Sequence, residues 1–412
     1  MKNIGIIGAG VSSLHLGIRL IQAGHKATLY SPVNAEQIAQ SRMTNSVSHQ
    51  FDTVLREREM GLEYWDESNC RVSQGHHHFI NSHQGEPLFF WGTFNGYGKA
   101  VDYRMYLPRL MQTFEEQGGL IEYSTVTANE LSDLAERHDL IAIGTGKSKD
   151  GFADLFPRVD HLSVHKEPAR LICCGLYKGV RDADPCGVTI SISVGHGELI
   201  EIPMQSMSGA VTVLLFENIR GGDMEDLMTL SYEESPERFN QIILQKLKKH
   251  HTSTYDRVDH ALFGLTRSQD LLQGALLPIT RECYTKLANG KYAIATGDLR
   301  VTMDPVNGQG ANLASYGACA LADEIIAAGD TELDEDFCKH YEKTTAYRVE
   351  GTVNFNNAIL NPQAQLFQLL QAMAANRKIA DDFTSRFSRP ETAWWDILQS
   401  PELTEDYITS FN

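Results

Sequence analysis

Residues 297–324, with the sequence GDLRVTMDPVNGQGANLASYGACALADE, decide the fold of this chain. They follow an apolar run at 292–296 that predicts a β-strand, and they end in a helical pattern of apolar and small residues. Asp298 directly follows the strand, where its carboxylate can accept hydrogen bonds from sugar hydroxyls. The turn at 305–310 exposes backbone N–H groups at a helix N-terminus, which favours negative charge. It therefore suits a flavin ring, whose reduced form carries such charge.

A second glycine-rich turn lies at the start of the chain. Residues 3–10, NIGIIGAG, predict an apolar strand that runs into glycines, and an amphipathic helix follows. This is the dinucleotide-binding fingerprint, in which Gly8 and Gly10 match and Ser13 stands in place of the third glycine. Either turn alone is compatible with a structural role. Together they predict an FAD-binding domain of Rossmann type.

With these motifs the chain resembles the flavoprotein monooxygenases of the p-hydroxybenzoate hydroxylase fold. It resembles most closely the FAD-dependent oxygenase subunit of the two-component styrene and indole monooxygenases. The stretches that carry this closer resemblance are distributed over most of the chain: GAGVSSLHLG (8–17), SRMTNSVSH (41–49), AVDYRMYLP (100–108), DLIAIGTGK (139–147), LICCGLYKGV (171–180) and GDLRVTMDPVNGQGANLASYGACALADEI (297–325). The last stretch is the most specific of them.

The resemblance implies an α/β fold with three parts. A Rossmann-like FAD-binding domain is expected from the discontinuous segments 1–55, 100–160 and 275–350. An inserted antiparallel β-sheet domain, expected at 56–99 and 161–274, would bind the substrate. Helices are expected at 351–412.

Residue patterns along the chain also predict individual helices and strands. Helices are expected at 102–117 and 235–250, and short strands at 120–123 and 140–143. Residues 188–204 alternate like one half-buried strand, and residues 209–219 indicate a more buried strand. After residue 330 the pattern is helical, with a break at Asn361-Pro362.

The site residues follow from the same resemblance. It implies that Asn45 lies in the substrate cavity beside the reactive edge of the flavin, which makes it the candidate catalytic residue. The other residues expected to bind substrate are Val47, His49, His76 and Gly98. The residues expected to bind the cofactor are Gly8, Gly10, Ser12, Ser13, Arg42, Arg104, Asp298, Pro305, Gly308, Gly310, Ala311 and Asn312. For Arg42, a solvated position on a loop is the equal alternative.

Three consecutive histidines at 76–78 raise the question of a metal site. In a strand, His76 and His78 face one way and His77 the other, so the three cannot bind one ion together. No acidic or cysteine ligand lies nearby at zinc-like spacing. A strand with one histidine facing the pocket is the favoured interpretation, and no metal is predicted.

The resemblance implies that FADH2 and O2 form a C4a-hydroperoxyflavin, which epoxidises an aryl-conjugated C=C bond. The substrate would be styrene, at its vinyl group, or indole, at its 2,3-bond. Gly144-Thr145-Gly146 replaces the Asp-Gly motif of single-component hydroxylases, and no second dinucleotide fingerprint is found. We therefore expect FADH2 to come from a separate NAD(P)H-dependent flavin reductase.

Three alternatives belong to other classes. A single-component NAD(P)H-dependent aromatic hydroxylase of the same fold would consume NADH without a partner. A flavin-dependent halogenase would carry a W-x-W-x-I-P element, and none of the 4 tryptophans lies in one. A non-enzymatic flavin-binding protein would bind FAD and form no oxygenated product.

Composition sets the remaining expectations. The 412 residues have a net charge of −17, which argues against nucleic acid and anionic membrane surfaces as partners. No signal peptide or apolar membrane span is apparent, and the 7 scattered cysteines favour reduced thiols in the cytoplasm. The resemblance also implies a possible homodimer.

Overall fold

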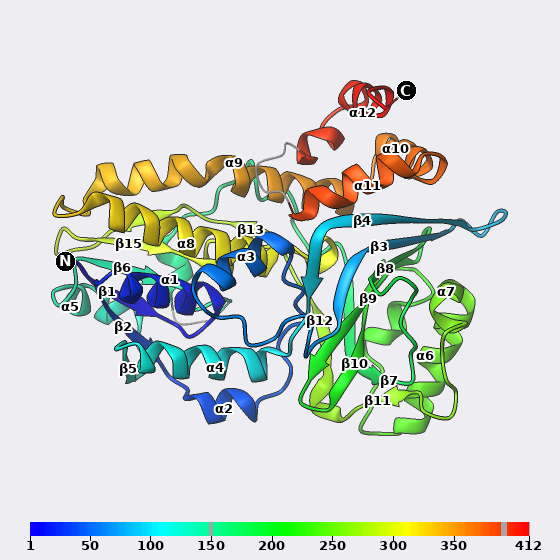
Figure 1. Ribbon diagram of the computed structural model, residues 1–412, viewed down its shortest axis with the longest axis horizontal. Helices are drawn as coiled ribbons and strands as arrows, with labels where there is room; N and C mark the ends of the chain where they lie inside the picture. Colours follow the sequence, from blue (N-terminus) through cyan, green and yellow to red (C-terminus); the bar gives the residue numbers. More distant parts are fainter. Residues whose placement is uncertain (148–150, 389–393, 412) are drawn as a thin grey trace.

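Two β-sheets lie side by side, and helices cover their outer faces (Figure 1). The computed structural model describes residues 1–147, 151–388 and 394–411. The first sheet has six strands and the second has eight. This architecture confirms the predicted α/β fold class, with a Rossmann-like unit, an antiparallel-type sheet and C-terminal helices.

The six-stranded sheet is the nucleotide-binding half. Its strand order is β14-β15-β6-β1-β2-β5, and all neighbours are parallel except β14 and β15. The strands are β1 (Asn3–Ile7), β2 (Lys26–Ser31), β5 (Leu120–Tyr123), β6 (Leu140–Ile143), β14 (Tyr284–Lys286) and β15 (Tyr292–Ala295). The strands predicted at 120–123 and 140–143 are confirmed, as is the β-α-β start of the chain.

Three helices pack together on this sheet: α1 (Val11–Gln22), α4 (Tyr103–Glu116) and α8 (Gly310–Ala328). Asp102 caps α4 by accepting a hydrogen bond from the backbone N–H of Arg104, and this confirms the helix predicted at 102–117. Helices α1 and α4 approach each other closely at Gly17. A Cβ at this position of α1 would lie only 2.6 Å from the Phe114 ring of α4, so a small residue is needed there.

The eight-stranded sheet has the order β11-β7-β10-β9-β8-β3-β4, with β12 also paired to β7. All its pairs are antiparallel except β3 with β8. The strands are β3 (Val72–Asn81), β4 (Leu88–Lys99), β7 (Leu171–Lys178), β8 (Val188–Ser193), β9 (Gly197–Ser206), β10 (Gly209–Asn218), β11 (Gly264–Leu265) and β12 (Leu271–Ala275). The buried strand predicted at 209–219 is β10.

The single strand predicted at 188–204 is wrong, because this stretch forms the hairpin of β8 and β9. Gly195 and Gly197 have φ angles of 81° and 131°, which reverse the chain at residues 194–196. Both strands keep the same alternation of apolar and polar residues, so the pattern does not reveal the turn between them.

The two faces of the eight-stranded sheet have different partners. Helix α6 (Pro236–His250) is capped by Ser235 and confirms the helix predicted at 235–250. It packs on the outer face of the sheet through Phe239 and Ile243. The inner face carries an apolar cluster that includes Ile200 and Leu215. This inner face is turned toward the six-stranded sheet.

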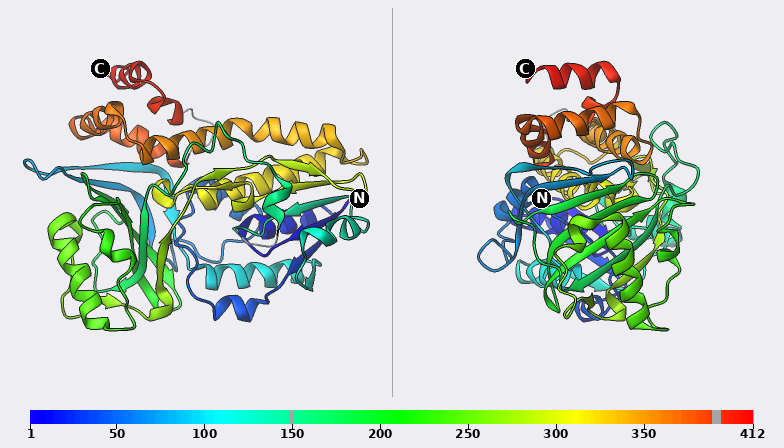
Figure 2. Two further views of the ribbon diagram at one scale, coloured as in Figure 1. Left: turned by 180° about the vertical axis from the view of Figure 1, so that it is seen from behind. Right: turned by 90° about the vertical axis from the view of Figure 1, so that its right-hand side faces the viewer.

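The C-terminal helices lie over both sheets. Helix α9 (Glu335–Leu360) runs above α8, and Figure 2 shows the last helix outermost, beyond α10 and α11. The helices after α9 are α10 (Ala364–Ala375), α11 (Arg377–Ser385) and α12 (Pro401–Thr409). The break predicted at Asn361-Pro362 is confirmed, since it separates α9 from α10.

Short elements complete the fold. The strands β13 (Ile279–Thr280) and β16 (Val301–Thr302) form a ribbon. The short helices are α2 (Ala35–Ala39), α3 (Phe51–Glu59), α5 (Leu131–Ala135), α7 (Thr252–Tyr255), η1 (Ala128–Glu130), η2 (Phe152–Leu155), η3 (Glu225–Met228), η4 (Ser268–Asp270), η5 (Gly297–Leu299), η6 (Pro305–Asn307), η7 (Arg386–Ser388) and η8 (Trp394–Leu398). No helix in the described parts of the chain is long and apolar enough to cross a membrane. All seven cysteines are free thiols.

Candidate functional site

A cavity of about 770 Å³ opens between the two sheets, a volume typical of ligand pockets. One wall consists of turns that include Gly8 and Gly144, at the carboxyl ends of the parallel strands β1 and β6, and Gly308, shortly before α8. The opposite wall consists of apolar side chains of the eight-stranded sheet: Ile172, Ile200, Ile202, Leu215 and Leu272. Residues 44–48 border the cavity between these walls.

Two helix N-termini face this cavity. Helix α1 begins after Gly10 and α8 begins at Gly310, and neither has a side chain that caps its first turn. Backbone N–H groups of each first turn are therefore available to a negatively charged ligand. At Gly308 and Gly310 an added Cβ would meet no atom within 4 Å, so the turn before α8 borders open space.

The turn before α1 is tightly constrained. Gly8 has a φ of 101°, and a Cβ there would lie 2.4 Å from the carbonyl oxygen of Gly144. Glycine is thus required both by the backbone conformation and by the close approach of the β6 end. The predicted fingerprint at 3–10 has the strand–turn–helix context that dinucleotide binding needs.

Asp298 is the acidic group of this wall. Its carboxylate lines the cavity and lies 3.7 Å from the ammonium of Lys147. Burial raises the pKa of Asp298, and the nearby lysine opposes that rise. Two uncapped helix N-termini, a glycine cradle and a carboxylate acceptor together fit FAD, with its diphosphate, flavin and sugar hydroxyls.

The predicted site residues divide into two groups. The cavity brings together Gly8, Gly10, Ser12, Asn45, Val47, Asp298, Pro305, Gly308, Gly310 and Ala311. The lining of this cavity does not include Ser13, Arg42, His49, His76, Gly98, Arg104 or Asn312. The contacts of the residues in the second group explain why they do not line the cavity.

Both predicted cofactor-binding arginines contact the second sheet instead. The Arg42 guanidinium is 60% exposed, donates to the carbonyl of Ser268 at 3.1 Å and lies 3.9 Å from Glu233. Arg104 is buried between Asp102 and Asp270, at 2.5 and 2.7 Å from their carboxylates. Its charge is neutralised there, so Arg104 ties α4 to the start of β12 and is not free to bind a phosphate.

His49 belongs to a buried network behind the cavity wall. Its two ring nitrogens lie 2.6 Å from Glu57 and 2.8 Å from the hydroxyl of Tyr103. Glu57 also forms an ion pair with Lys99 at 2.7 Å, and burial alone would raise its pKa, but His49 and Lys99 lower it to about 2. Tyr103 itself lines the cavity, so His49 reaches the site only through that side chain.

Gly98 lies behind the same loop, where a Cβ would meet the carbonyl oxygen of His49 at 3.3 Å. His76 is buried in β3 and packs edge-on against Phe94 and Phe387, with centroids 4.8 and 4.7 Å away. Burial lowers its pKa well below the ordinary value, so it is a neutral core side chain. The prediction that it faces the pocket is corrected accordingly.

Asn312 and Ser13 support the site from behind. The Asn312 amide accepts from the backbone N–H of Gln50 at 2.8 Å and donates to the carbonyls of Ser48 and Gly308 at 3.0 and 2.9 Å. It therefore fixes the segment that carries Asn45 to the turn before α8. Ser13 is fully buried in α1.

Two carboxyl groups that no motif assigns to the site lie at the cavity margin. Glu217 on β10 shares the inward face of Leu215, and neither of its carboxyl oxygens has a hydrogen-bond partner among the described residues. Asp304 lines the cavity directly before the turn at Pro305. Burial, together with the nearby Asp304, raises the pKa of Glu217 well above its ordinary value. A charged residue at an inward position of an apolar strand is the sequence signal for this group.

Comparisons with known proteins agree with this site. A family model described as the styrene monooxygenase A putative substrate binding domain matches residues 148–257. Styrene monooxygenase StyA from a Pseudomonas species is 38% identical, covering 100% of this chain and 98% of its own. Styrene monooxygenase StyA from Pseudomonas fluorescens is also 38% identical, covering 97% of this chain and 96% of its own.

Solved structures share the fold at low identity. The flavin-dependent brominase Bmp2 has a TM-score of 0.70 at 15% identity, covering 100% of this chain and 98% of its own. PqsL, a probable FAD-dependent monooxygenase from Pseudomonas aeruginosa, has a TM-score of 0.62 at 16% identity, covering 87% and 96%.

Fold, cavity and relatives together define a flavin-dependent monooxygenase. The chain belongs to the styrene monooxygenase family, as an oxygenase of the two-component type, because its similarity to the curated members extends over its whole length.

Proposed function

We propose that this enzyme epoxidises an aryl-conjugated C=C bond, the vinyl group of styrene or the 2,3-bond of indole. It would use O2 and FADH2 that a separate NAD(P)H-dependent flavin reductase supplies. The observation that carries the proposal is the single cavity in which two uncapped helix N-termini face an apolar wall. The names of the curated relatives support styrene as the substrate. A second copy of the chain is the other proposed partner.

Reduced flavin, when bound, activates O2 and supplies one oxygen atom. The chain's own groups have separate tasks in that reaction. The N–H groups at the start of α1 would bind the diphosphate, and the Asp298 carboxylate would accept from a sugar hydroxyl. The N–H groups at the start of α8 would hold the negatively charged edge of the flavin.

The apolar wall would bind the aryl group and exclude water. Ile200, Ile202 and Leu215 present only aliphatic groups to the cavity, so an uncharged hydrocarbon substrate leaves no buried polar atom unpaired. Asn45 lies between this wall and the glycine turns, and its amide would orient the substrate beside the flavin.

The deciding experiment uses the purified chain with chemically reduced FAD, air, and styrene or indole. Styrene oxide or an oxidised indole product, formed without a reductase and without NADH, is expected. Reoxidation of the flavin with no product from either substrate would contradict the proposed reaction. Consumption of NADH by the chain alone would favour a single-component hydroxylase.

Asn45 has its own test. In Asn45→Ala we expect product formation to fall about tenfold, because the amide that would orient the transferred oxygen or the substrate beside the flavin is lost. The affinity for FAD, measured by flavin fluorescence, should stay within about twofold. Gln40→Ala is the control, because Gln40 is exposed nearby in the chain and outside the cavity lining. Unchanged product formation in Asn45→Ala would remove this residue from the mechanism.

A further inference from the structure

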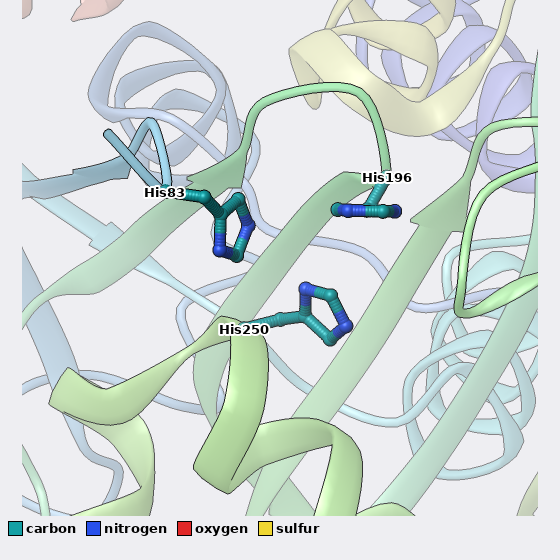
Figure 3. A group of neighbouring side chains, drawn as sticks. All are labelled: His83, His196 and His250. Atoms are coloured by element: carbon teal, nitrogen blue, oxygen red, sulfur yellow. The ribbon is translucent and has the colours of Figure 1, made fainter.

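Three histidines gather on the outer side of the eight-stranded sheet, away from the cavity lining. His83 lies on the β3–β4 hairpin, His196 on the β8–β9 turn and His250 at the end of α6 (Figure 3). One ring nitrogen of each lies within 4.8 Å of the others. We propose that these three imidazoles form a binding site for a divalent cation of the zinc class.

The hydrogen bonds of the cluster orient its rings. Nε2 of His250 lies 2.8 Å from the carboxylate of Asp223, so it donates there and leaves Nδ1 as the acceptor. That Nδ1 is directed at the hydroxyl of Ser193, 2.8 Å away. A carboxylate on the distal nitrogen is the usual support of a metal-binding histidine.

Ser193 occupies the space between two of the rings. Its hydroxyl lies 2.8 Å from Nδ1 of His250 and also 2.8 Å from Nε2 of His83. The hydroxyl has one proton and can donate to only one of these nitrogens. The hydroxyl can pair with both nitrogens only when His83 carries its proton on Nε2, whereas a cation between the rings would bind the lone pairs of both.

The backbone holds His83 in an unusual conformation that is consistent with this role. His83 has a φ of 59°, and it is the only non-glycine residue with a positive φ in the described parts of the chain. This left-handed conformation is uncommon for residues with a side chain and often marks a functional position. The ring it carries lies 5.3 Å from that of His196 and 5.4 Å from that of His250, measured between centroids.

The electrostatic surroundings are neutral rather than repulsive. Lys246 lies 3.3 Å from Asp223 and 3.1 Å from Asp226, and Lys249 lies 3.2 Å from Asp223, so the two carboxylates balance the two ammonium groups.

Binding requires small movements of the side chains. Zinc–nitrogen bonds of about 2.0–2.1 Å place two ligand nitrogens about 3.4 Å apart in a tetrahedron, so the rings would approach one another by about 1 Å. Nδ1 of His196 now accepts a hydrogen bond of 3.0 Å from the backbone N–H of Asp223. His196 would give up this hydrogen bond when it binds the metal. Three ligands leave the fourth position to water. The ion would then tie the β3–β4 hairpin to the β8–β9 turn and to α6.

The test is a titration of the full-length protein, first treated with a chelator, with Zn²⁺. Isothermal titration calorimetry is expected to give one site with a dissociation constant tighter than about 10 µM. The midpoint of thermal unfolding should rise with added Zn²⁺.

His83→Asn is the decisive variant, because asparagine tolerates the left-handed conformation and only the imidazole is lost. We expect it to bind Zn²⁺ at least about tenfold more weakly. His161→Asn is the matched control, since His161 is exposed and outside the cluster, and its affinity should be unchanged. Binding weaker than about 10 µM in the unmodified chain, or equal affinity in His83→Asn, would overturn the proposal.

Discussion

The two walls of the cavity are built in different ways. The wall from the six-stranded sheet presents backbone, in the turns at Gly8 and Gly308 and in the first turns of two helices. The wall from the eight-stranded sheet presents aliphatic side chains, such as Ile200 and Leu215. Backbone turns at close approach tolerate no added atom, whereas side chains on a strand can change size without moving the strand. We propose that the first wall binds the cofactor (the cofactor wall) and the second binds the substrate (the substrate wall). The cofactor wall should therefore fail abruptly when changed at Gly8, where the close approach occurs, and the substrate wall should fail gradually.

Gly8→Ala is expected to give the largest effect on binding. The added Cβ meets the carbonyl oxygen of Gly144 at 2.4 Å, and the φ of 101° is unfavourable for alanine. A turn displaced by this contact can no longer bring its N–H groups to the diphosphate. We expect flavin affinity to fall about 100-fold, which corresponds to about 3 kcal/mol, as measured by flavin fluorescence.

Gly24→Ala provides the matched control. Gly24 also has a positive φ, 82°, but a Cβ there meets no atom within 4 Å. Alanine should therefore lower stability by about 1 kcal/mol and leave flavin affinity unchanged. Equal flavin affinities in the two variants would show that the close approach at Gly8 does not shape the binding turn.

Two fully buried glutamates extend the comparison of the walls. Behind the cofactor wall, Glu57 accepts hydrogen bonds from His49 and Tyr106 and an ion pair from Lys99, and these partners lower its pKa to about 2. Behind the substrate wall, Glu217 has no hydrogen-bond partner among the described residues, and burial raises its pKa. The surroundings of the first glutamate favour its anion, and those of the second disfavour it.

Glu217→Gln should change how stability depends on pH. Burial raises the pKa of the neighbouring Asp304 to about 6, so the folded protein binds more protons than the unfolded chain above about pH 4. Stability is therefore highest at the acid end of this window and falls as pH rises through 6. Glu217 also has a raised pKa and adds to that fall, so Glu217→Gln should flatten the profile and leave the part that Asp304 contributes, about 3 kcal/mol between pH 4 and pH 8. Urea unfolding at several pH values measures how the free energy of unfolding depends on pH.

The control for this change is Glu234→Gln, which removes one carboxylate from an exposed position. It should leave the shape of the pH profile intact. Glu57 does not interfere, because its lowered pKa affects stability only as pH falls below about 4. A Glu217→Gln profile as steep as that of the unmodified chain would show that folding does not raise the pKa of Glu217.

The cofactor wall was the more predictable part of the site for a physical reason. Its turns are contiguous in sequence, so strand, glycine and helix appear in order at 3–22 and at 292–328. The substrate wall is assembled from strands far apart in the chain, and neither Ile172 nor Leu215 belongs to a local motif. Arg104 and His49 were expected to bind ligands because the family resemblance implied it. Their real partners, Asp270 and Glu57, become visible only once the strands and helices are packed.

The pattern of apolar and polar residues along the chain revealed strands, but it did not reveal the turns between them. It identified β10 as buried, and it ran without interruption through the hairpin of β8 and β9. The same alternation places Leu214 against α6 and Leu215 in the cavity, two faces of one strand. That pair allows the substrate wall to be tested without disturbing the rest of the sheet.

Leu215→Val and Leu214→Val should give the smallest effects and the clearest contrast. Each removes one methylene from a buried position and should lower stability by about 1 kcal/mol. Only Leu215 lines the cavity, so only its variant should raise the KM for styrene, by about two- to fivefold, while flavin affinity stays the same. Steady-state product formation, with unfolding midpoints measured alongside, separates the two effects. If both variants raised KM equally, the inner face of β10 would not contact the substrate, and loss of stability alone would explain the change.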